Sequence, residues 1–152
     1  RMYIFHNTAF QPPPWHGQEE PSGVRFGLHI TGSDYEQRNM VSRNNVLECR
    51  RPEYNAITDP SEHPTNDFDW DLYFGRLRAA EDVEQHGIFA QPEYERGPDG
   101  RLWLRPDRPG HDAGRRLPNF NDHFHGAAPD MGAIETSDET ALPATWPEFP
   151  AP

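Results

Sequence analysis

PDMGAIE, at Pro129–Glu135, is the stretch of sequence that decides the fold. An aspartate two positions before a glycine is typical of a tight turn, because the carboxylate accepts backbone N–H groups and glycine adopts positive φ. Asp130 and Gly132 have this spacing, and so do Asp112 and Gly114 upstream. The sequence therefore predicts tight turns with structural roles at both positions.

Upstream, three segments share an asparagine or aspartate followed by apolar residues. They are Asn7–Phe10, Asn45–Leu47 and Asp71–Phe74, and their first residues are 38 and 26 positions apart. Spacings of about 20–50 residues are typical of architectures in which short strands of successive coils pair in parallel. Because an asparagine at a bend can bond to the neighbouring coil, we expect the three segments to lie side by side.

Alternating or short apolar runs predict the remaining strands. The expected strands are Arg1–Phe10, Val24–Ile30, Asn39–Cys49, Asp67–Phe74 and Gly100–Leu104. Proline-containing polar segments are expected to be loops. These are Gln11–Gly23 and Arg50–Thr65. One helix is predicted over Arg76–His86, since Leu77, Ala80 and Val83 follow a helical spacing before Gly87.

The composition narrows the classes of function. The net charge is −11 and every basic residue is arginine, so a nucleic acid is an unfavourable partner. Only 34% of the residues are hydrophobic, and 17 prolines and 12 glycines indicate a loop-rich chain. The single cysteine, Cys49, cannot form an internal disulfide. No apolar run approaches the roughly 20 residues of a membrane span.

Several segments together resemble the right-handed parallel β-helix repeat proteins of bacteria. The resemblance rests on His6–Thr8, Arg43–Val46, Phe68–Phe74, His86–Tyr94, Leu104–Gly114 and Ala128–Glu135. The chain departs from the family pattern at several positions. Asp71 stands where asparagine is usual, Gln91 replaces aspartate, and Arg108, Gly110 and His111 replace residues of the penultimate motif.

The resemblance implies an all-β fold. We expect the C-terminal coils of a right-handed parallel β-helix, a solenoid, over residues 1–135, with one short helix. Residues 136–152 form a proline-rich C-terminal extension in this interpretation. The open strand edge at Arg1 would then need a partner, either the N-terminal part of the same polypeptide or a neighbouring subunit.

Many members of the family act on carbohydrates, and others are tail spikes, adhesins or surface proteins without catalysis. The resemblance therefore implies an extracytoplasmic protein, secreted, periplasmic or on the cell surface. Our expectation is a polysaccharide lyase that acts on an acidic polysaccharide. The alternatives are a non-catalytic surface, adhesion or assembly protein and a glycoside hydrolase, because the fold alone does not choose among them.

A lyase acting on a uronic acid needs a cation for the carboxylate, a base for the α-proton and an acid for the leaving oxygen. Side chains of these kinds are densest at His29, Tyr35, Arg38 and Arg43, which are the candidate catalytic residues. Trp15 and His16 lie in a predicted loop and are the candidate substrate-binding residues, since tryptophan can stack on a sugar ring. The structural alternative for both sets is ordinary polar surface.

Metal binding has two candidate positions, although the resemblance implies no required cofactor. Asp122, His123 and His125 contain the ligand types of a transition-metal site. Calcium is a further candidate, because alternation along a strand would place three carboxylates on one side. These belong to Asp67, Asp69 and Asp71, of which Asp71 is otherwise expected to point inward at the bend.

Overall fold

The computed structural model describes residues 1–10, 37–96 and 101–136, and the backbone of residues 26–29. Within these ranges the regular structure is made of β-strands, and there is no helix that could cross a membrane. The first parallel sheet has the order β1 (Met2–Phe5), β4 (Met40–Arg43), β7 (Asp67–Phe68). The second has the order β10 (Ile88–Phe89), β8 (Leu72–Phe74), β5 (Val46–Glu48), β2 (Thr8–Phe10). The third has the order β3 (Phe26–His29), β6 (Asn55–Thr58), β9 (Arg76–Arg78).

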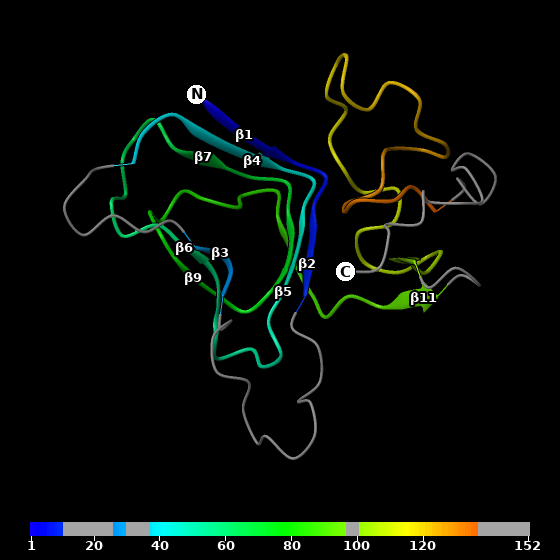
Figure 1. Cartoon of the computed structure of the whole chain (residues 1–152), viewed down its shortest axis with the longest axis horizontal. Helices are drawn as coiled ribbons and strands as arrows, with labels where there is room; N and C mark the ends of the chain where they lie inside the picture. The colour runs from blue at the N-terminus through cyan, green and yellow to red at the C-terminus, as the bar shows by residue number, and fades with distance from the viewer. Residues whose placement is uncertain (11–25, 30–36, 97–100, 137–152) are drawn as a thin grey trace, which may run out of the picture.

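An antiparallel pair follows the parallel sheets in the chain. It consists of β11 (Tyr94–Arg96) and β12 (Leu102–Leu104). Figure 1 shows β11 beside the second sheet, on the side away from the first and third sheets. From there to residue 136 the described chain consists of turns and irregular segments, which carry both pockets described below.

The prediction of a right-handed parallel β-helix with one short helix is wrong. The described residues form four small, separate sheets, parallel and antiparallel, in which no solenoid is detected. The strands are only two to four residues long, and each parallel sheet ends after three or four of them. After β10 the chain leaves the parallel sheets, so their pairing does not continue through the C-terminal third.

The predicted helix over Arg76–His86 is absent because its backbone has tertiary partners. Arg76–Arg78 is strand β9, which pairs with β6, and the Arg76 N–H donates to the Tyr54 carbonyl. Further on, Glu84 has a positive φ of 53° and its N–H donates to the Phe68 carbonyl. A short helix with modest propensity is marginal in water, so strand pairing and burial override it here.

Strand pairing confirms the predicted alignment of the three upstream segments. Thr8 pairs with Val46, and Val46 with Leu72, in parallel register. The polar residue that precedes each strand is hydrogen-bonded to the polar residue that precedes the neighbouring strand. The Asn7 N–H donates to Asn45 Oδ1 at 2.9 Å, and the Asn45 N–H donates to Asp71 Oδ1 at 2.7 Å. These hydrogen bonds, the polar ladder, hold the strand beginnings in register; the one to Asp71 is buried and the one from Asn7 is partly buried.

Strand β5 is covered on both faces. Leu47 belongs to an interior cluster between the parallel sheets, whereas Val46 belongs to a second cluster beneath the C-terminal third of the chain. The second cluster also contains Leu72, Leu104 and Met131, all at most 2% exposed. Burial of both faces explains why two successive residues of β5, Val46 and Leu47, are apolar. It also attaches the pocket-bearing segment firmly to the second sheet.

The closing segment packs against the strands and adopts the predicted turn at Gly132. This residue has a φ of 101°, and a Cβ there would lie 2.8 Å from Thr8 Oγ1, so only glycine fits. Asp130 accepts the N–H groups of Asp112 and Thr136, each at 2.7 Å, as predicted. At Gly114 the predicted positive φ is wrong: the position needs glycine because a Cβ would lie 2.7 Å from the Pro129 carbonyl oxygen.

Candidate functional site

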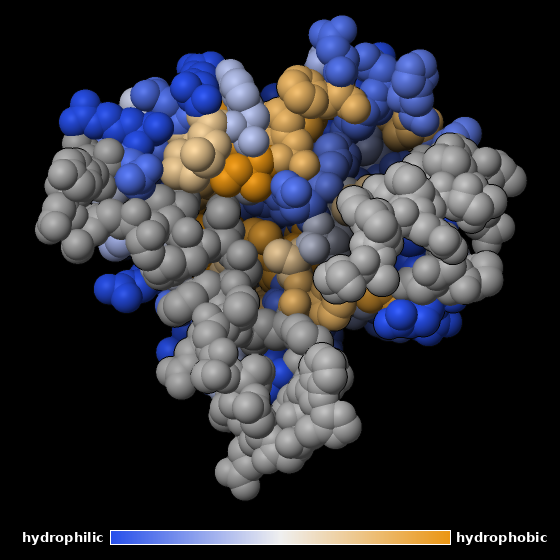
Figure 2. Space-filling model, in the orientation of Figure 1, coloured by the Kyte–Doolittle hydropathy of each residue, from blue (hydrophilic) through white to orange (hydrophobic). Residues whose placement is uncertain are grey.

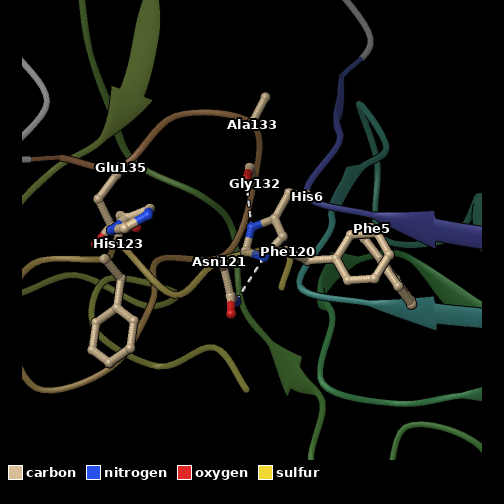
Figure 3. Close-up of a pocket in the computed structure, with 9 residues that line it drawn as sticks. Phe5, His6, Phe120, Asn121, His123, Gly132, Ala133 and Glu135 are labelled. Carbon is tan, nitrogen blue, oxygen red and sulfur yellow. Dashed lines mark hydrogen bonds between the residues drawn. The ribbon is translucent and has the colours of Figure 1, made fainter. Parts of the chain in front are cut away.

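The first pocket lies where the end of β1 meets residues 120–135. Its volume is about 360 Å³, within the range of small-ligand sites. Figure 3 shows the rings of Phe5 and Phe120 on one side and His123 and Glu135 on the other, with His6 between them. Phe5 and Phe120 pack edge to face, with centroids 5.2 Å apart and an interplanar angle of 89°. Phe124, Asn121, Gly132 and Ala133 complete the lining.

His6 is the anchor of this pocket. Its Nδ1 lies 3.2 Å from the Gly132 carbonyl oxygen, and its Nε2 lies 3.1 Å from Asn44 Nδ2 and 2.9 Å from Asn121 Nδ2. Both amides also donate to the Arg115 carbonyl, which fixes their orientation. Nε2 therefore accepts and Nδ1 carries the proton. Burial lowers the pKa of His6, which favours this neutral form.

This hydrogen bonding limits the chemistry of His6. Its acceptor nitrogen already receives two amide N–H groups, so taking up a proton there would disrupt the junction between β1 and the C-terminal segment. His6 is thus a positioning residue, and the groups that face the pocket with exposed atoms are His123 and Glu135. Glu135 is oriented by the N–H groups of His125, at 3.3 Å, and Asp130, at 3.0 Å.

A second, smaller pocket lies on the other side of Glu135. Its volume is about 180 Å³, and it is lined by His111, Asp112, His125, Asp130 and Glu135, with Gly126 and Thr136. One ligand atom from each of His111, Asp112 and Asp130 lies within 4.8 Å of the others. These are the described side chains grouped most favourably for holding a metal ion.

The predicted transition-metal residues do not form one site. The side chain of Asp122 is 33% exposed, and its Oδ1 lies 3.1 Å from Arg116 Nη2; hydrogen bonds from the Asn119 N–H and from Arg116 lower the pKa of Asp122. His123 lines the first pocket and His125 the second. Of the three, only His125 lies beside the group that could hold a metal.

Each of the three carboxylates that the sequence predicts as calcium ligands has hydrogen-bond or ion-pair partners within the protein. Asp67 pairs with Arg43, and Asp69 accepts the N–H and the Nδ1 of His86, each at 2.7 Å. Asp71 is fully buried in the polar ladder. Calcium at these positions stays a prediction, although all three carboxylates are already engaged in hydrogen bonds or ion pairs.

The predicted catalytic set is only partly described. Arg43 is buried and donates to the Ser42 and Asp67 carbonyls at 2.6 and 2.9 Å, so it ties β4 to β7. Arg38 is exposed. The side chain of His29 and the whole of Tyr35, Trp15 and His16 lie outside the described residues. Their roles in catalysis and substrate binding stay predictions.

The sequence did not predict the residues that line the two pockets, for reasons that differ from residue to residue. His6 and Asn44 were visible only as parts of repeated motifs, and the recurrence of a polar residue before Asn7 and Asn45 was the one available signal. Turn chemistry predicts Asp112 and Asp130 as structural residues, so the sequence does not single them out as metal ligands. Glu135 lines both pockets, and no motif in the sequence around it predicts this position.

No protein-family model, curated protein or solved structure matches the chain. These comparisons therefore give no support to the resemblance to the β-helix repeat proteins.

Proposed function

We propose that the protein binds a neutral sugar unit of a polysaccharide in the first pocket. The observation that supports this is the pairing of the aromatic rings of Phe5 and Phe120 with an imidazole and a carboxylate across the pocket, with Phe124 as a third aromatic residue of the lining. The apolar face of a sugar ring packs on aromatic rings, while its hydroxyl groups donate to a carboxylate and exchange hydrogen bonds with histidine. Binding of such a polymer fits a protein that acts at the cell surface, in the periplasm or after secretion.

The charges favour a neutral sugar over an acidic one. Glu135 lies in the pocket wall and the chain has a net charge of −11, so a uronate would be repelled unless a cation neutralised it. Glycoside hydrolysis usually needs a pair of carboxylates flanking the bond, and the described lining of this pocket contains one. The proposal is therefore binding without catalysis.

Replacing Phe120 with alanine tests the sugar site. Phe120 is 68% exposed, so its removal is expected to leave the fold intact. The affinity for a neutral polysaccharide should fall by about twofold to tenfold, the effect of one ring contact of roughly 0.5–1.5 kcal/mol. Affinity electrophoresis against a panel of neutral polysaccharides, followed by calorimetry with oligosaccharides of the best one, measures it.

Phe89→Ala is the matched control, since Phe89 is 59% exposed and contacts Tyr73 and Phe74 on the second sheet. It should bind as the wild type does. Equal loss in both variants, or no binding to any neutral polymer, would contradict the proposal. The same panel, extended to uronate polymers and followed at the absorbance of unsaturated sugars, tests the lyase prediction: product on a uronate polymer would favour it over pure binding.

A second proposal concerns a partner subunit at the edge of β1. Within the described part of the chain no strand pairs with the outer edge of β1, and Met2 and Tyr3 are 55% and 53% exposed. Figure 2 shows apolar side chains gathered around the corner between β1 and β2 on this face. Open apolar edges favour strand addition, so we propose that a second copy of the chain pairs there.

Tyr3→Pro tests this proposal. The N–H groups of Met2 and His6 donate to the carbonyls of Asn39 and Arg43, on the β4 side, so by alternation the Tyr3 N–H points to the open edge. Proline removes that donor and should convert an oligomer to a monomer in light scattering, whereas Tyr3→Ala, which keeps the donor, should remain associated. A wild-type chain that stays monomeric at all concentrations would overturn the proposal.

A further inference from the structure

We propose that the second pocket binds a divalent transition-metal ion of the zinc class. The ligands are His111, Asp112 and Asp130, and His125 and Glu135 stand at the edge of the same hollow. The site is distinct from the sugar pocket, and the two share only Glu135. The proposal does not depend on sugar binding.

The distances between the three ligand atoms are compatible with coordination of a single metal ion. Zinc bonds of about 2.0–2.2 Å place two ligand atoms no more than about 4.4 Å apart. The three ligand atoms lie within 4.8 Å of one another, so a shift of a few tenths of an ångström brings them to one centre. His111 Nδ1 and Asp112 Oδ2 are 3.8 Å apart, too far for a hydrogen bond but suitable for two ligands of one ion.

Asp112 is the side chain that most needs an explanation. It was predicted to accept backbone N–H groups in a turn, but no donor among residues 1–10, 37–96 and 101–136 bonds to its carboxylate; its own N–H donates to Asp130. Its φ is +49°, and a Cβ on Gly126 would lie only 2.1 Å from its Oδ1. Gly126 thus leaves room for the carboxylate in the pocket lining, where the side chain is 30% exposed and has no hydrogen-bond donor among the described residues.

Asp130 supplies the fixed side of the site. It is 2% exposed, and it accepts the N–H groups of Asp112 and Thr136 and the Thr136 hydroxyl. These donors set the orientation of the carboxylate and leave one lone pair, on Oδ1, for a metal, as in sites where outer hydrogen bonds orient a ligand. His111, at 20% side-chain exposure, is half-buried at the rim.

The chemical types of the ligand atoms decide which metal ion the site prefers. Imidazole nitrogen with carboxylate oxygen suits zinc and neighbouring transition metals, whereas calcium prefers six to eight oxygen ligands. We therefore expect the full-length chain, after treatment with a chelator, to bind Zn²⁺ in calorimetry and to bind Ca²⁺ far more weakly. Added Co²⁺ should give visible absorption bands that report nitrogen and oxygen ligands.

Two ligand variants and a matched control test the site. His111→Ala and Asp112→Asn should each weaken Zn²⁺ binding by more than about tenfold, the loss that follows removal of even an outer-shell partner. His123→Ala, a histidine of the same segment that lines the sugar pocket, should bind Zn²⁺ as the wild type does. Circular dichroism checks that each variant is folded.

Failure of this site is distinguishable from failure of the sugar site. The wild type should gain thermal stability with Zn²⁺, because an ion that binds only the folded state stabilises it by about 2.7 kcal/mol at 100 times its dissociation constant. Absence of Zn²⁺ binding by the wild type overturns the metal proposal, as does equal binding by His111→Ala and His123→Ala. Neither outcome affects the test of the sugar proposal, which measures polysaccharide binding by the Phe120→Ala variant.

Discussion

Asp71→Ala is expected to lower the free energy of unfolding by about 3–5 kcal/mol, the cost of breaking a buried charged network. Asp71 is fully buried and accepts hydrogen bonds from the Ser42 hydroxyl, the Asn45 N–H and the Asn45 side-chain amide. Alanine leaves these buried donors without an acceptor, and each such group costs about 1–3 kcal/mol. Urea denaturation followed by circular dichroism measures the loss.

Asp71→Asn is the matched control. Asparagine keeps an oxygen for both Asn45 donors, and its amide can donate to the Ser42 hydroxyl and to Glu84, whose carboxylate accepts the Asp71 N–H at 3.0 Å. We therefore expect it to lose less than about a third of what the alanine variant loses, since the donors stay satisfied. Equal destabilisation by both variants would show that the polar ladder needs the charge, not the acceptor.

The second large effect is on pH dependence. Burial, followed by the charge of Asp71, raises the pKa of Glu84 to about 10. Burial also raises the pKa of Asp71, and a hydrogen bond joins the two carboxyl groups, so the pair holds one proton at neutral pH. The folded chain keeps this proton, whereas the unfolded chain releases it above the ordinary value of 4.5.

Because the folded state binds more protons, stability falls as the pH rises from 4.5 toward about 10. The slope from Glu84 alone is up to about 1.4 kcal/mol per pH unit. His6 acts in the opposite direction only below its ordinary value of 6.5, since burial lowers its pKa. Tyr73 and Tyr94, whose pKa values burial raises, begin to act only near 10. The window from about pH 7 to 9.5 therefore reports the coupled pair of Asp71 and Glu84.

Glu84→Gln removes this dependence. The amide oxygen can accept the Asp71 N–H, and the amide nitrogen can donate to the Asp71 carboxylate, so both bonds survive without a titrating group. Urea unfolding of both proteins across the window should give a steep decline for the wild type and a flatter line for the variant. The prediction is wrong if the two lines run parallel.

The part of the fold that the sequence predicted follows from the hydrogen-bonding needs and backbone preferences of individual residues. An amide or carboxylate at the start of a strand needs partners one strand away, and this requirement aligns Asn7, Asn45 and Asp71. Gly132 and Asp130 likewise reveal their turn from residue type alone. These are short-range rules, so they appear in the sequence.

The same rules failed where a residue's local preference was opposed by its neighbours in space. Residues 76–86 have helical spacing, but their N–H groups are used by β6 and by the Phe68 carbonyl. Strand β6 lies inside Arg50–Thr65, a segment whose polar composition predicts a loop. Its backbone pairs with β3 and β9 on either side, and its Ala56 and Ile57 are fully buried in the interior cluster.

The sequence by itself therefore determined which strand beginnings pair and where glycine and aspartate make the closing turn. Only the tertiary structure decided the fold of separate small sheets and the two pockets. His6 contacts Gly132 across 126 residues and Asn121 across 115. The metal-ligand group similarly depends on the docking of the closing segment beside Asp112. Such contacts depend on how the C-terminal segment packs over Val46 and Leu72, a packing that leaves no periodic signal in the chain.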